Sequence, residues 1–156
     1  MVKSQNKTAL IFVSWLLATI CMGVIFWLSS RPATVSSSQS SGMIQWINDT
    51  FGIKLSSFFV RKTAHFLEFA GLSLLINNAV YQSCGRKKII LSVFLTSLYA
   101  LSDEIHQIFV VGRACQFRDW VIDTGGAVFG ILIFLFLFWL IVALKGGKNE
   151  NALSRS

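Results

Sequence analysis

The chain has 156 residues, of which 54% are apolar and only 13% are charged. Soluble domains have about 25% charged residues, so the composition excludes a water-solvated domain and indicates a single membrane domain. The net charge of +7 does not indicate nucleic-acid binding, because the cations cluster beside long apolar runs and the aromatic residues lie inside those runs.

The first expected element is a transmembrane helix over residues 9–28, an uncharged run between Lys7 and Arg31. At 1.5 Å per residue this helix is about 30 Å long, which is the thickness of the hydrocarbon core. A signal peptide usually has a shorter apolar region, of about 7–15 residues, followed by a small-x-small cleavage site. No convincing site of that kind follows this run, so we expect a retained anchor.

The next segment is expected to be a loop followed by an interfacial element. Residues 31–42 are rich in Ser and Gln and contain the only proline, Pro32, which is typical of a loop. In residues 43–60 apolar residues recur at roughly helical spacing among polar ones, and Trp46 suits the headgroup level. A short helix in the membrane interface, or a re-entrant turn broken near Gly52, fits this pattern better than a full span.

Three further transmembrane helices are expected over residues 62–80, 89–109 and 120–144. Helices are expected because a spanning segment must satisfy its own backbone hydrogen bonds. The predicted fold class is therefore all-α, a polytopic membrane helix bundle of about four transmembrane helices plus a short interfacial helix. This domain would cover residues 1–145, and residues 146–156 would form a polar, disordered cytoplasmic tail.

The distribution of cations predicts that both termini are cytoplasmic. Positive residues are enriched on the cytoplasmic side of bacterial membrane proteins. The predicted spans place six cations and six of the seven acids on the outer side. They place eight cations on the other side, namely Lys3, Lys7, Arg86, Lys87, Lys88, Lys145, Lys148 and Arg155.

Unusual polar residues converge at the outer ends of the last three spans. Ionisable groups at membrane depth cost a few kcal/mol each, so they should face the bundle interior. Residues three or four apart share a helix face, and Gly126 and Gly130 continue the face of Asp119 and Asp123 as a small-xxx-small packing line. The candidate functional residues are Lys62, His65, Glu68, Asp103, Glu104, His106, Gln107, Arg113, Asp119 and Asp123.

Several chemistries are compatible with this set. Histidine and carboxylates could bind a divalent metal, although no cofactor is predicted outright, and a His–Glu pair could do general acid–base work. Arg113 and Arg118 could bind a phosphate or a carboxylate. The H-E-x-x-H, G-x-S-x-G and Gly-rich phosphate-loop motifs are all absent, and the three cysteines form no C-x-x-C pair. Buried ion pairs that only fix helix register remain the alternative.

These residues resemble the motifs of the VanZ-like family. The resemblance rests on Lys62-Thr63-Ala64-His65-Phe66 with Phe69, on Glu104 to Phe109 with Gly112-Arg113, and on Asp119 through Asp123, Gly126 and Gly130. The segment from Phe26 to Pro32, with the Ser-rich stretch after it, is similar to the family's F-x-x-S-S-x-P. The resemblance covers about residues 10–140. Asp123 replaces the Asn of many members, and Cys115-Gln116-Phe117 replaces smaller or polar residues.

The resemblance implies a role in the bacterial cell envelope, because the family's namesake is associated with low-level resistance to the glycopeptide teicoplanin. The implied partners are membrane lipids, a lipid-linked envelope precursor or a glycopeptide. One hypothesis is that the outer cluster binds such a molecule. The other is an enzyme that acts on a lipid-linked substrate, with His65 or Glu104 as a base or a metal ligand.

Overall fold

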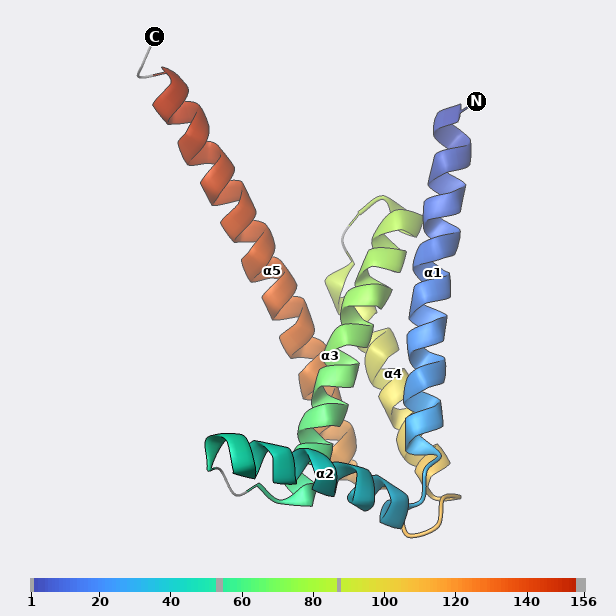
Figure 1. Cartoon of the computed structure of the whole chain (residues 1–156). Helices are drawn as coiled ribbons and strands as arrows, with labels where there is room; N and C mark the ends of the chain where they lie inside the picture. The colour runs from blue at the N-terminus through green and yellow to red at the C-terminus, as the bar shows by residue number, and fades with distance from the viewer. Residues whose placement is uncertain (1, 53–54, 87, 154–156) are drawn as a thin grey trace.

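The computed structural model describes residues 2–52, 55–86 and 88–153, which form helices and connections without any strand. Four helices lie along one another, and α2 crosses one end of this bundle (Figure 1). Both termini lie at the other end. The all-α prediction is confirmed. The helices are α1 (Val2–Ser29), α2 (Ala33–Phe51), α3 (Ser57–Cys84), α4 (Ile89–Gln107) and α5 (Phe117–Leu153).

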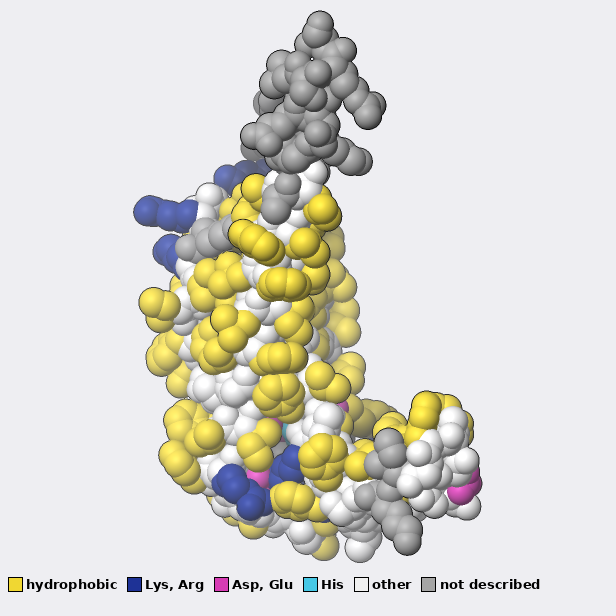
Figure 2. All heavy atoms as spheres, turned by 90° about the vertical axis from the view of Figure 1, so that its left-hand side faces the viewer, with side chains coloured by type: hydrophobic (Ala, Val, Ile, Leu, Met, Phe, Trp, Pro, Cys, Tyr) yellow, Lys and Arg dark blue, Asp and Glu magenta, His cyan; other side chains and the backbone are white. Residues whose placement is uncertain are grey.

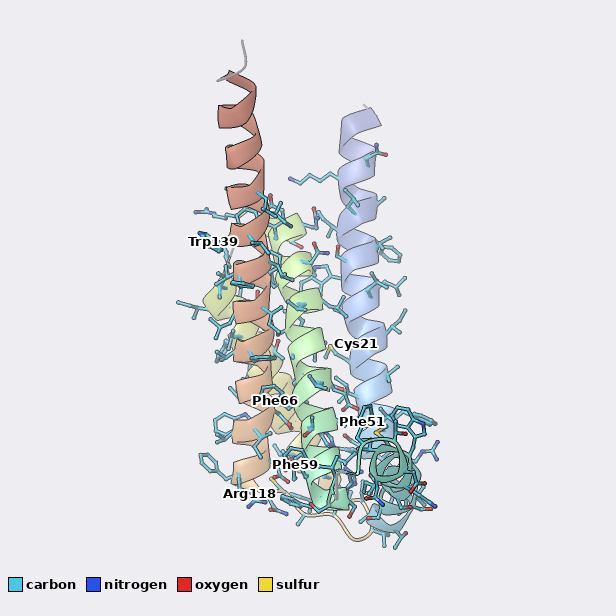
Figure 3. All side chains as sticks on the ribbon, turned by 60° about the vertical axis from the view of Figure 1, so that its left-hand side comes forward. Cys21, Phe51, Phe59, Phe66, Arg118 and Trp139 are labelled. Carbon is cyan, nitrogen blue, oxygen red and sulfur yellow. The ribbon has the colours of Figure 1, made fainter. Side chains whose placement is uncertain are left out.

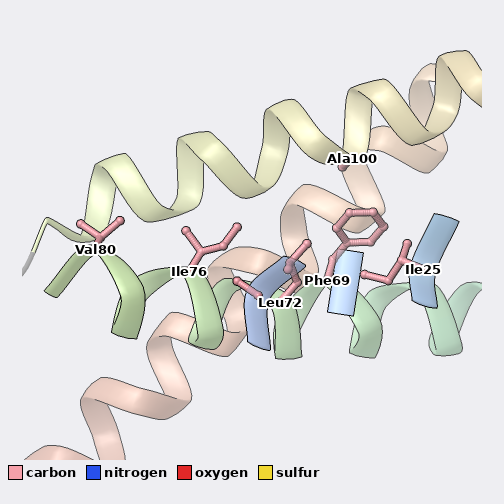
Figure 4. Close-up of a cluster of buried hydrophobic side chains, with 7 residues drawn as sticks. Ile25, Phe69, Leu72, Ile76, Val80 and Ala100 are labelled. Atoms are coloured by element: carbon pink, nitrogen blue, oxygen red, sulfur yellow. The ribbon is translucent and has the colours of Figure 1, made fainter. Parts of the chain in front are cut away.

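The central helix of the bundle is α3, which contacts each of the other four. Its buried apolar residues recur every three or four positions, so they share one face. This face meets Ala18 and Ile25 of α1 and Ala100 of α4 (Figure 4). The α3 residues of this core are Phe69, Leu72, Ile76 and Val80.

Three helices have the length and composition to cross a membrane, within the part of the chain that the structure describes: Asn6–Ser29, Ile89–Gln107 and Phe117–Val142. Large apolar side chains on them are exposed, and hydrophobic side chains cover the length of the bundle between cations at its two ends (Figure 2). Such a surface suits lipid rather than water. Three of the four expected spans thus qualify. The expected span over residues 62–80 lies in α3 and is not among the three. α3 is long enough, with 28 residues, but it carries more polar residues than the three helices that qualify.

The prediction of a loop over residues 31–42 is wrong, because α2 begins at Ala33. Pro32 occupies the N-cap with φ −52°, an angle that suits a helix start. The hydroxyls of Ser37 and Ser40 each donate a 2.8 Å hydrogen bond to the carbonyl four residues earlier. These serines are therefore satisfied inside a helix and do not end it. The helix stops at Gly52, which has φ 68°, and one of the two alternatives for residues 43–60 had placed a break there.

Three other helices are longer than expected, and the first of them, α1, begins at Val2 instead of residue 9. α3 begins at Ser57, and the side chain of Ser56 caps it by accepting the backbone N–H of Phe59. α5 runs from Phe117 to Leu153, beyond the start of the expected polar tail. That stretch contains two Gly and two Asn, which disfavour a helix, beside Lys, Glu, Ala and Leu, so its composition did not predict the extension. Residues 154–156 lie outside the described residues.

Candidate functional site

A polar cavity of about 510 Å³ lies at the end of the bundle that α2 crosses. Its walls come from the first turns of α2, α3 and α5, the last turns of α4 and the loop between α4 and α5. Seven of the ten candidate residues line it: Lys62, His65, Glu104, Gln107, Arg113, Asp119 and Asp123. The structure therefore brings together most of the residues that the sequence singled out.

An ion pair between Lys62 and Asp119 joins α3 to α5 on the wall of this cavity. Their side chains are only 23% and 8% exposed, and a charge this deeply placed needs a partner. The Lys62 ammonium and the Arg118 guanidinium also lie 5.4 and 5.0 Å from the centre of the Phe58 ring, in cation–π range. Arg118 lies at the base of α5, at the same end as α2 (Figure 3).

The three acids that line the cavity are buried, and two of them, Glu104 and Asp119, have partners within the protein. The carboxylate of Glu104 accepts the backbone N–H of Gln116 at 2.9 Å, which ties the α4–α5 loop to α4. Asp123 lies one turn after Asp119 on α5, and its side chain is buried. These carboxylates thus form part of the wall rather than free charges at the cavity mouth.

The two arginines of the cavity differ from the lysine, because neither pairs with a carboxylate in the described residues. Arg113 donates from Nε to the carbonyl of Arg31 at 3.0 Å, and Arg61 donates to the hydroxyl of Ser37 at 3.3 Å. Burial lowers the pKa of Arg113, and the neighbouring Arg61 charge lowers this pKa further, against the opposing effect of nearby carboxylates. An anion would relieve this repulsion and could bind both guanidinium groups.

A second cavity, of about 490 Å³, forms an apolar groove between α2 and α3. It shares Arg61, His65 and Arg113 with the polar cavity, so the two meet at these side chains. Glu68 lines this groove rather than the polar cavity. The apolar lining residues are Leu28, Met43, Ile47, Leu55, Phe59, Val60, Ala64 and Leu67.

His65 and Glu68 lie one turn apart on α3, with His65 Nδ1 3.6 Å from Glu68 Oε2. Both atoms are buried, and neither has a hydrogen-bond partner among the described residues. Buried polar atoms are normally hydrogen-bonded. His65 Nδ1 and Glu68 Oε2 can therefore still form hydrogen bonds with a bound molecule.

Asp103 and His106 face α1 instead of the cavities. The Asp103 carboxylate accepts hydrogen bonds from the Ser29 hydroxyl at 2.7 Å and from the Gln107 amide at 3.0 Å. The His106 ring lies 4.2 Å from the Phe26 ring, and its Nε2 is 3.1 Å from the Ser30 hydroxyl. Both residues therefore fasten α4 to the end of α1.

Gly126 and Gly130 let α5 approach α3 at backbone distance. A Cβ atom on Gly126 would overlap the carbonyl oxygen of Phe66, and one on Gly130 would lie 2.6 Å from the Ser73 hydroxyl. The Phe66 ring also lies 5.3 Å from that of Phe129 on α5. This close approach holds the first turns of α5 against the cavity.

Metal binding stays a prediction. Within residues 2–52, 55–86 and 88–153, no group of three or more His, Cys, Asp or Glu side chains is arranged to hold a metal ion. The three cysteines, Cys21, Cys84 and Cys115, are free.

Two residues that contact the site were not singled out in the sequence: Ser37 and Gln116. Ser37 lies in a Ser-rich stretch with the composition of a loop, and a backbone donor such as that of Gln116 cannot be recognised from its side chain. Ser29, which donates to Asp103, was indicated only by the family resemblance of Phe26 to Pro32. Arg61 is one position from Lys62 and lines both cavities. The only indication in the sequence that Arg61 belongs to the site was its helical spacing, which puts it on the same face as His65 and Glu68.

A family model described as VanZ/LLP1 matches residues 12–140. No curated protein and no solved structure matches the chain. The matched range contains all ten candidate residues and the lining of both cavities.

Proposed function

This chain belongs to the VanZ/LLP1 family, and from that membership we propose that it is a multi-pass protein of the bacterial cell membrane whose polar cavity binds an anionic group of an envelope molecule. The envelope molecule would be a membrane lipid, a lipid-linked wall precursor or a glycopeptide. Binding of this kind would account for low-level resistance to teicoplanin in the family. The observation that carries the proposal is the pair of arginines, Arg61 and Arg113, without carboxylate partners in the described residues.

In this proposal α3 is the fourth span, and the polar cavity opens on the outer face. α3 lies in the middle of the bundle, so its polar residues would be shielded from lipid by its neighbours. The end that carries both termini also has Arg86 and Lys88, and cations favour the cytoplasmic side. The cavity lies at the other end.

The chemistry of the cavity favours an anion. A guanidinium group offers several N–H donors in a planar fork that matches a phosphate or a carboxylate. The remaining cation of the cavity, Lys62, forms an ion pair with Asp119, and Glu104 accepts a hydrogen bond from a backbone N–H. The arginines are therefore the groups most available to a ligand.

Substitutions in a teicoplanin-sensitive bacterium that expresses the chain test this proposal. Arg61→Gln, Arg113→Gln, Glu104→Gln and His65→Ala should each lower the inhibitory concentration of teicoplanin toward that of cells without the chain. Membrane levels of each variant are measured by immunoblot. Arg86→Gln is the matched control, because it removes the same charge at the opposite end and should retain protection. Full protection by all four site variants would rule the proposal out.

A second candidate function is a membrane-embedded enzyme that acts on a lipid-linked substrate. The observation that favours it is the buried His65–Glu68 pair, whose facing atoms lack hydrogen-bond partners in the described residues. His65 would act as a base, and Glu68 would orient it. Cells that express the wild type and cells that express His65→Ala should then differ in their lipids or wall precursors by mass spectrometry. Metal analysis of the purified protein shows whether an ion takes part, and identical profiles would argue against this candidate.

A further inference from the structure

We propose that the ligand is an amphiphile, whose hydrocarbon chain lies in the groove between α2 and α3 while Arg61 and Arg113 hold its anionic head. This inference rests on the proposed function and names the class of ligand. The observation that carries it is the meeting of a polar and an apolar cavity at the same two guanidinium groups.

The groove is built from matching faces of two helices. On α2 the lining residues are spaced by three or four, so they form one stripe, and half of the eight that α3 supplies are apolar. Its volume of about 490 Å³ falls within the usual range for ligand pockets, about 300–1,000 Å³. The stripe on α2 consists of Ser36, Ser40, Met43 and Ile47.

A polar cavity that adjoins an apolar one suits an amphiphile, which has a charged head and an apolar chain. A free anion would need only the polar cavity, and a neutral hydrocarbon would need only the groove. Arg61, His65 and Arg113 line both, so a molecule that spans the junction would place its charge beside guanidinium groups and its chain among aliphatic side chains.

The groove is also placed where a lipid chain could enter. α2 projects from the side of the bundle, and hydrophobic side chains cover the upper side of the projecting part while an acid lies on its lower side (Figures 1 and 2). Met43, Trp46 and Phe51 are more than half exposed on this helix. Such an amphipathic helix suits the membrane interface, at the level where lipid heads and chains meet.

Native mass spectrometry of the full chain, released from a non-ionic detergent, tests the inference with three probes. Tetradecyl phosphate has both a chain and an anionic head, butyl phosphate has the head with a short chain, and tetradecanol has the chain alone. We expect tetradecyl phosphate to bind at least about ten-fold more tightly than either of the others, since each lacks one set of contacts. This comparison uses the wild type, so it does not depend on how any variant folds.

Variants then assign each part of the probe to its cavity. Ala64→Phe fills the groove from an exposed position on α3, and Arg113→Gln removes a donor from the junction. Each should weaken tetradecyl phosphate binding about ten-fold. Ala9→Phe is the matched control, because it makes the same substitution at an exposed position on α1 and should leave binding unchanged.

Two results would overturn the inference in distinguishable ways. If butyl phosphate binds as tightly as tetradecyl phosphate and only Arg113→Gln weakens binding, the anion site stands and the chain site is wrong. If tetradecanol binds as tightly as tetradecyl phosphate and Arg113→Gln changes nothing, the anion site is wrong, and the proposed function fails with it.

Discussion

The hydroxyl of Ser29, the last residue of α1, donates a 2.7 Å hydrogen bond to the carboxylate of Asp103 on α4. Both side chains are shut off from the surroundings, with Ser29 0% and Asp103 2% exposed. A carboxylate at this depth depends on the donors around it, because an unpaired buried charge is costly. The bond therefore fixes α1 beside the residues that line the cavities.

Ser29→Ala should lower the stability of the protein by about 1 kcal/mol, because Asp103 then keeps only the amide of Gln107 as a side-chain donor. Ser102→Ala is the control, since the exposed Ser102 hydroxyl donates to the carbonyl of Tyr99 in its own helix, α4. Thermal unfolding in detergent gives the comparison. Equal melting temperatures for the two variants would contradict the role of the Ser29 bond.

Gly126→Ala and Gly130→Ala should destabilise the protein, because a Cβ atom at either position would collide with α3. The adjacent Gly125 offers a control, since a Cβ there would lie 3.8 Å from the Phe66 ring, an ordinary contact. Gly125→Ala should be neutral or stabilising by up to about 1 kcal/mol, because Ala favours a helix more than Gly does. Unfolding in SDS measures the order, and a loss of stability in Gly125→Ala equal to that in Gly126→Ala would contradict it.

Removing one partner of the Lys62–Asp119 pair should destabilise the protein by about 1–3 kcal/mol, because it leaves a largely buried charge unpaired. Lys62→Met and Asp119→Leu are the single variants, and the double variant should recover part of the loss. A thermal double-mutant cycle measures the coupling. Strictly additive losses would show that the two side chains do not depend on each other.

Two native cysteines test the orientation. Cys84 is exposed at the end of α3 near Arg86, and Cys115 is exposed in the loop beside the cavity. With the other two cysteines replaced by serine, Cys115 should react with a membrane-impermeant maleimide on intact cells, and Cys84 should react only after lysis. The reverse pattern would place the cavity on the cytoplasmic side.

The sequence could predict the convergence of the site because membrane helices impose simple rules. The spacing of Asp119 and Asp123, and the cost of placing acids in lipid, were enough to turn them inward. The ends of the helices were harder to predict from the sequence. The Ser-rich start of α2 has the composition of a loop, and only its hydroxyl bonds back to the preceding turn show how it stays helical.

The sequence also could not predict which neighbouring helix each polar side chain contacts. Asp103 and His106 share a face with Gln107 by spacing, yet both contact α1 instead of the cavities. Periodicity gives the direction of a side chain around its own helix, but not which neighbour occupies that direction. The apolar groove was missed for the same reason, because it depends on how α2 lies against α3.

The connection between α1 and α2 and the connection between α4 and α5 are joined to each other by hydrogen bonds. The backbone N–H of Ala33 bonds to the carbonyl of Val111 at 3.2 Å, and Arg113 holds the carbonyl of Arg31. Gly112 lies so close to Ala33 that a Cβ atom there would be 3.2 Å from the Cβ of Ala33. Local opening of either connection must break bonds to the other, so both should exchange their amide hydrogens as one cooperative unit.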